Sequence, residues 1–154
     1  GGLLYVGFLG SHLIFLRDAP NGSDWVLLVL LATFATDTAA YIVGRLIGRT
    51  KISPAISPGK TLEGSLGGLV AGAAAVLVLN WALDAGAGAE IVLLALLLPV
   101  FAQFGDLAES LIKRGGGVKD ASRVIPGHGG FLDRLDSLLF TVPLVYYFLT
   151  WVIL

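Results

Sequence analysis

The chain has 154 residues, of which 56% are hydrophobic and 14% charged, and its mean hydropathy is +0.86. This composition is too apolar for an ordinary water-soluble domain, so a lipid bilayer must surround most of the chain. A net charge of −1 and the absence of cysteine argue against nucleic-acid binding, a disulfide framework and a thiolate zinc site.

Five apolar stretches predict an all-α, polytopic bundle of about five transmembrane helices. No basic segment precedes the first stretch, Leu3–Leu16, whereas the apolar region of a signal peptide is preceded by one. We therefore interpret residues 1–24 as a clipped membrane helix and an external loop. Residues 25–154 form one transmembrane domain, because lipid favours helices and the alternation of barrel strands is absent. Its spans have the length that a bilayer requires: Trp25–Gly48, Leu62–Leu83, Glu90–Lys113 and Leu135–Leu154.

Basic residues gather at one end of the predicted bundle. Two connections on the same side, together with the helix ends beside them, carry Arg45, Arg49, Lys51, Lys60, Lys113, Arg114, Lys119, Arg123 and Arg134. The positive-inside rule therefore places this end in the cytoplasm.

Small residues recur at every fourth position from Ala32 to Gly48 and from Gly64 to Gly72. Such stripes allow helix backbones to approach closely, so we assign both to helix packing and not to ligand contact.

Acidic residues lie inside or beside the spans, near the basic end. Asp106 and Asp37 precede Lys113 and Arg45 by seven and eight residues, which corresponds to a depth of about 10–12 Å. A carboxylate inside a span costs at least about 2.5–3.5 kcal/mol, so each needs a compensating partner. The acids that converge at this depth are Asp37, Glu63, Asp106, Glu109, Asp133 and Asp136.

Two interpretations of these acids are open. They can be neutralised as ion pairs with Lys113, Arg114, Lys119 or Arg134, and for Glu109 and Asp136 we do not choose between the two. For Asp106 and Asp133 we favour ligation of a hard, oxygen-bound cation such as Mg²⁺, since the chain offers no cysteine and only two histidines.

Two loops that are both basic and rich in glycine predict phosphate binding. One covers residues 113–130, and the other, Ser57–Gly64, opens a helix whose N-terminus also attracts anions. We assign Lys60 and Lys119 to substrate phosphate, and the more peripheral Arg49 and Lys51 to lipid headgroups. Loop packing, phosphate binding and proton transfer all remain open for His128.

The run from Ser110 to Asp136 resembles the signature of phosphatidate cytidylyltransferases, also called CDP-diacylglycerol synthases. Its matching positions are Lys113-Arg114, Lys119-Asp120, Pro126-Gly-His128-Gly-Gly and Asp133-Arg134-Leu-Asp136. The segments Asp37–Gly48, Ser57–Gly64 and Gly105–Ser110 resemble the other blocks of that family in the expected order. The resemblance covers residues 37–136.

This resemblance implies transfer of the cytidylyl group of CTP to phosphatidate, which gives CDP-diacylglycerol and pyrophosphate for phospholipid biosynthesis. It implies a Mg²⁺-dependent homodimer in the bacterial inner membrane, with residues 25–154 as the catalytic domain. Asp106 and Asp133 would hold a metal pair, with K⁺ as a candidate second ion. Lys119, Asp136 and Glu109 are further candidate catalytic residues, and candidates for substrate binding are Asp37, Lys60, Glu63, Lys113, Arg114, Arg123, His128 and Arg134.

Two other functions fit parts of the pattern. A CTP-dependent lipid-alcohol kinase would need similar contacts but would transfer the γ-phosphoryl group. A non-enzymatic cation pathway would also use buried carboxylates, although the basic loops would repel cations at its mouth.

Overall fold

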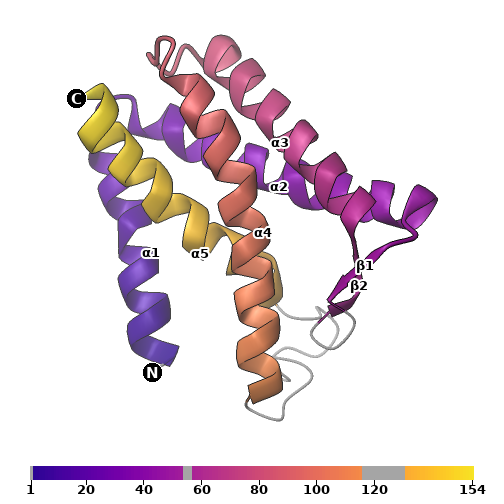
Figure 1. Ribbon diagram of the computed structural model, residues 1–154. Coiled ribbons are helices and arrows are strands. Elements are labelled where there is room, and N and C mark those ends of the chain that lie inside the picture. Colours follow the sequence, from indigo (N-terminus) through magenta and orange to yellow (C-terminus); the bar gives the residue numbers. More distant parts are fainter. Residues whose placement is uncertain (1, 54–56, 116–130) are drawn as a thin grey trace.

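The computed structural model describes residues 2–53, 57–115 and 131–154, which form five α-helices and a short β-hairpin (Figure 1). The helices confirm the predicted all-α architecture, because each of the five apolar stretches forms one. Their bounds are α1 Gly2–Asp18, α2 Gly22–Ile47, α3 Leu62–Leu83, α4 Ile91–Gly115 and α5 Phe131–Phe148, and α5 continues into the π-helical turn Leu149–Ile153.

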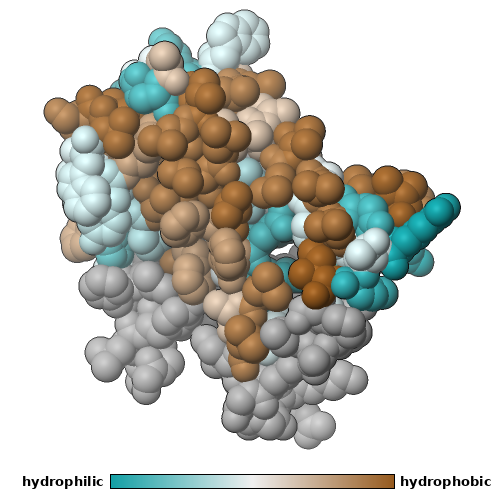
Figure 2. All heavy atoms as spheres, viewed as in Figure 1, coloured by the Kyte–Doolittle hydropathy of each residue, from teal (hydrophilic) through white to brown (hydrophobic). Residues whose placement is uncertain are grey.

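Three of the helices are long and apolar enough to cross a membrane: α2, α3 and the first part of α4, Ile91–Ala108. Large apolar side chains point outward from them, including Val70 at 72% exposed and Trp81 at 84%. On the face shown in Figure 2, apolar residues cover most of the helices that are coloured, and hydrophilic residues gather near the hairpin. Since such a surface suits lipid and not water, the chain is an integral membrane protein.

Helices α2 and α3 pack through their small residues. A Cβ atom added to Gly64 would lie 2.6 Å from the carbonyl oxygen of Ala40 and 2.9 Å from the Cα atom of Gly44. One added to Gly68 would lie 2.9 Å from the Cβ atom of Ala40. These distances leave no room for larger side chains, which agrees with the predicted packing role of both stripes. Ala40, Gly44 and Gly48 of the first stripe also line the pocket described below, so packing is not their only contact.

The buried core lies at the end of the bundle away from the hairpin. Trp25, Leu28, Leu94, Leu98 and Val145, from α2, α4 and α5, are fully buried there. Helix α1 packs against α5. The core holds the helices together at one end and leaves the other end for a pocket.

The hairpin between α2 and α3 was not predicted. Strand β1 (Lys51–Ser53) pairs antiparallel with β2 (Ser57–Thr61), and Lys51 lies opposite Thr61. The segment Ser57–Gly64, expected as a loop, is therefore a strand followed by the first turn of α3. Its sequence has no apolar alternation to indicate a strand, so contacts with neighbouring segments decide its conformation.

The carboxylate of Glu63 fixes the hairpin to α3. It accepts hydrogen bonds from the backbone N–H groups of Arg49 at 3.1 Å and Thr50 at 3.2 Å. The N–H group of Leu62 donates to the carbonyl oxygen of Thr50 at 2.8 Å. These bonds close the turn after α2 and hold the hairpin beside the bundle.

Candidate active site

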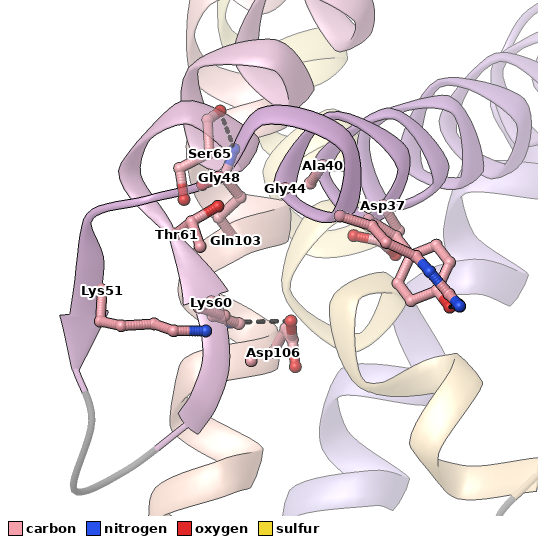
Figure 3. A pocket seen from close by; sticks show the side chains of 13 residues that line it. Asp37, Ala40, Gly44, Gly48, Lys51, Lys60, Thr61, Ser65, Gln103 and Asp106 are labelled. Carbon is pink, nitrogen blue, oxygen red and sulfur yellow. Dashed lines mark hydrogen bonds and ion pairs between the residues drawn. The ribbon is translucent and has the colours of Figure 1, made fainter.

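A pocket of about 560 Å³ lies where the hairpin meets α2, α3 and α4 (Figure 3). This volume is within the usual range for small-molecule sites. Polar side chains from four elements reach its wall: Asp37, Tyr41 and Arg45 from α2, Lys51 and Lys60 from the hairpin, Ser65 from α3, and Gln103 and Asp106 from α4. The pocket is therefore at the end of the bundle where the sequence predicts the site.

Asp106 and Lys60 form an ion pair across the pocket, with 2.7 Å between Oδ2 and Nζ (Figure 3). Lys60 is 19% exposed, and its ammonium nitrogen is buried, whereas Asp106 is 42% exposed. The pair supplies the compensation that a carboxylate near an apolar span requires. The cation comes from the hairpin, however, and not from the basic residues expected as partners.

Gln103 and Asp106 lie three residues apart on one face of α4, and both line the pocket. Their spacing of three residues places both side chains on the same side of the helix. The amide nitrogen of Gln103 donates to the carbonyl oxygen of Ser65 at 2.9 Å, which joins α4 to α3. The absence of a side chain at Gly68 leaves space for this amide, since an added Cβ would lie 3.1 Å from its nitrogen.

Two further basic side chains reach the pocket, although sequence analysis did not place them at the site. Lys51, which was assigned to lipid headgroups, lies on the wall because hairpin pairing sets it opposite Thr61, which also lines the pocket. Arg45 also lines the pocket, and its guanidinium donates to the hydroxyl of Tyr41 at 2.8 Å. Only the strand register could have indicated the position of Lys51, and the sequence carries no signal for that register.

The two acids predicted at the site from α2 and α3, Asp37 and Glu63, differ from each other in position. Asp37 lines the pocket from α2, as expected. Glu63 does not line it, because its carboxylate is directed to the backbone of Arg49 and Thr50. The geometry gives Glu63 a role in holding the hairpin, and its contact with substrate stays a prediction.

The remaining candidate residues cannot be placed in the pocket. Lys119, Arg123 and His128 lie outside the described residues. For Glu109, Lys113 and Arg114 in α4, and for Asp133, Arg134 and Asp136 in α5, the side chains lie outside the description as well. Helices α4 and α5 do pack against each other, as a meeting of Asp106 and Asp133 would require. The roles of all these residues stay predictions.

The described residues fit part of a metal site. They contain no group of three or more His, Cys, Asp or Glu side chains positioned to hold a metal ion. Two carboxylates, those of Asp37 and Asp106, nevertheless reach the same pocket, and hard oxygen donors are the ligands that Mg²⁺ prefers. A complete set of ligands would need an additional acid, and α5 carries Asp133 and Asp136 in its first turns.

Known proteins resemble this chain closely. A model of the cytidylyltransferase family matches residues 2–152. Phosphatidate cytidylyltransferases from Staphylococcus haemolyticus and Brucella suis are 42% and 43% identical to it over 145 and 148 residues, which are 93% and 96% of this chain. The matches cover 56% and 55% of those relatives, so the chain spans about half the length of the curated relatives that it matches.

A solved structure supports the architecture. An intramembrane enzyme for archaeal membrane lipids biosynthesis superposes with a TM-score of 0.59 and 25% sequence identity. The superposition covers 78% of this chain and 74% of that one. The similarity therefore extends over most of the helical bundle.

Proposed function

This chain belongs to the cytidylyltransferase family, and on that premise we propose that it is the catalytic part of a phosphatidate cytidylyltransferase. The enzyme would transfer the cytidylyl group of CTP to phosphatidate and release pyrophosphate. One observation carries the proposal: a pocket with three cationic side chains, Arg45, Lys51 and Lys60, lies at one end of a membrane bundle. Such a pocket suits two phosphorylated substrates, one of which is anchored in lipid.

Charge is the main obstacle to this reaction, because both substrates are anions. A phosphate oxygen of phosphatidate attacks the α-phosphorus of CTP in line, a P–O bond forms there, and the bond to the β-phosphate oxygen breaks. The second pKa of a phosphomonoester is about 6, so the nucleophile is already a dianion at neutral pH and needs no general base. Lys60 and Lys51 then serve to hold the phosphates together and to stabilise the charge on departing pyrophosphate.

Asp106 and Asp133 are the residues that we propose to hold Mg²⁺, with K⁺ as a candidate second ion. A bound divalent cation would neutralise phosphate charge that the basic side chains leave uncompensated. Asp106 supports this role because its carboxylate is half-exposed in the pocket and already faces a cation, the ammonium group of Lys60.

We also propose that the site faces the cytoplasm from a bacterial inner membrane. Arg45 lies in the last turn of α2, and Arg49, Lys51 and Lys60 lie between α2 and α3, on the side that the positive-inside rule assigns to the cytoplasm. CTP would reach the pocket from that side, while the acyl chains of phosphatidate stay in the leaflet. The homodimer remains a proposal that rests on the family resemblance.

The test uses the parent protein in phospholipid vesicles that contain phosphatidate, with CTP labelled at either the α- or the γ-phosphate. Label from the α position should enter the lipid, and γ label should leave with pyrophosphate. Appearance of γ label in lipid would replace the proposal with a kinase. Cation flux without transfer of either label would favour a cation pathway.

A further inference from the structure

Two side-chain contacts define how α5 lies against α2. The rings of Trp25 on α2 and Phe148 on α5 are 6.4 Å apart between centroids. The hydroxyl oxygens of Thr33 on α2 and Thr141 on α5 are 3.1 Å apart. From the first contact to the second, the residue number rises from 25 to 33 along α2 and falls from 148 to 141 along α5. The two helices therefore run in opposite directions with a defined register.

The hydrogen bond between Thr33 and Thr141 is directional. Both side chains are fully buried. Within α5, the hydroxyl of Thr141 donates to the carbonyl oxygen of Ser137 at 3.1 Å. Since a hydroxyl group has a single hydrogen, Thr33 is the donor between the helices and Thr141 the acceptor. The bond joins one position of α2 to one position of α5, whereas the apolar contacts of the core have no preferred direction.

Pro143 makes this bond important for the end of α5 that leads to the site. Because proline has no backbone N–H group, the carbonyl oxygen of Leu139 has no helical partner, and α5 is weakened at this point. Phe148 lies on the core side of Pro143, and Thr141 lies on the site side. The threonine bond thus holds the segment of α5 that the core contacts beyond Pro143 hold less firmly.

The register continues from the threonine bond to the pocket. Four residues after Thr33 comes Asp37, which lines the pocket from α2. Eight residues before Thr141 comes Asp133, about 12 Å away along the axis of α5. In this register, position 133 corresponds to Tyr41 of α2, which also lines the pocket. A slip of α5 by one residue would move position 133 by about 1.5 Å and turn it by about 100°.

We propose that Thr33 and Thr141 are positioning residues, which set the register of α5 so that Asp133 comes to the Mg²⁺ that Asp106 would hold. The proposal rests on the proposed function and adds the residues that align its metal site. Neither threonine lines the pocket, so both act through the placement of α5. Groups that orient metal ligands typically change metal affinity by about 10–100-fold when they are removed.

Thr141→Val in the parent protein removes the hydroxyl group and keeps the branched side chain. Binding of Mn²⁺, a paramagnetic substitute for Mg²⁺, is measured by electron paramagnetic resonance, together with thermal unfolding. We expect the Kd for Mn²⁺ to rise by about tenfold or more in protein that remains folded. Thr141→Ser, which retains the hydroxyl group, should bind Mn²⁺ nearly as tightly as wild-type protein.

A double-mutant cycle tests the bond itself. Thr33→Val breaks the same hydrogen bond from the other helix, so it should raise the Kd for Mn²⁺ by a similar factor. The variant with both substitutions should show no further rise, because the bond is already lost in either single variant. Effects that multiply in the double variant would show that the two hydroxyl groups act separately, and would overturn the proposal.

Thr36→Val is the matched control. Thr36 is also fully buried on α2, but its hydroxyl donates to the carbonyl oxygen of Ala32 in the same helix at 2.8 Å. The Kd for Mn²⁺ should not change in this variant. Unchanged Mn²⁺ binding in Thr141→Val, or an equal loss in Thr36→Val, would overturn the proposal. If wild-type protein binds Mn²⁺ but transfers no α label to phosphatidate, the proposed function fails and the positioning role stands.

Discussion

Replacing Lys60 by methionine removes the ammonium group that pairs with Asp106 at 2.7 Å and keeps an unbranched side chain. The substitution separates two roles of Lys60. As a structural partner it compensates a carboxylate at the end of an apolar helix, and as a functional residue it binds substrate phosphate. The two roles predict effects of different size on folding and on turnover.

The structural effect should be small. Pairs on a protein surface contribute about 0–1 kcal/mol, whereas loss of one partner from a buried pair costs about 3–5 kcal/mol. Asp106 is 42% exposed to the pocket and can be hydrated when Lys60 is absent. We therefore expect Lys60→Met to lower the free energy of unfolding by only about 1 kcal/mol.

The effect on turnover should be much larger. Loss of one preorganised donor at a site of developing charge typically lowers kcat by about 10²–10³-fold. Transfer of α label from CTP to phosphatidate is measured in the parent protein, together with thermal unfolding in the same detergent. Lys60→Arg, which retains the charge, should recover part of the activity. A loss of activity no greater than the loss of folded protein would refute the functional role of Lys60.

Two other predictions concern Gly64 and Glu63, which support the pocket without lining it. Gly64→Ala should lower the free energy of unfolding by about 1–3 kcal/mol, because its Cβ would meet the α2 backbone at 2.6 Å. Gly10→Ala, which has open space around its Cβ, should be neutral or stabilising in the same thermal assay, and equal losses would contradict the packing argument. Glu63→Gln should speed amide hydrogen exchange at Arg49 and Thr50, because a neutral amide is a weaker acceptor than the carboxylate. Unchanged exchange would refute the role of Glu63 in holding the hairpin.

Hydropathy and spacing predicted most of the fold because membrane helices have few alternatives. Lipid cannot satisfy free backbone groups, so every long apolar stretch had to be helical. The stripes that contain Gly44 and Gly64 likewise had one physical explanation, close packing, and their distances agree with it. The depth of Asp106 in the membrane, calculated from the helix rise and its distance to the basic end, stays a prediction.

The pocket wall was harder to predict because it depends on a hairpin with no sequence signature. Lys60 was assigned to phosphate from composition, but its pairing with Asp106 depends on how β2 lies against α4. Lys51 reaches the pocket through strand register, and Glu63 is drawn away from it by two backbone donors. Sequence spacing determines which residues share a helix face, and it does not determine which faces meet.

The central claim is that this pocket is the site of cytidylyl transfer, and Asp106→Asn in the parent protein tests it most directly. The substitution keeps the shape of the side chain and removes the charge that pairs with Lys60 in the pocket. Mg²⁺-dependent transfer of α label from CTP to phosphatidate is measured alongside thermal unfolding. We predict a folded protein without measurable transfer, and normal Mg²⁺-dependent transfer would contradict the assignment.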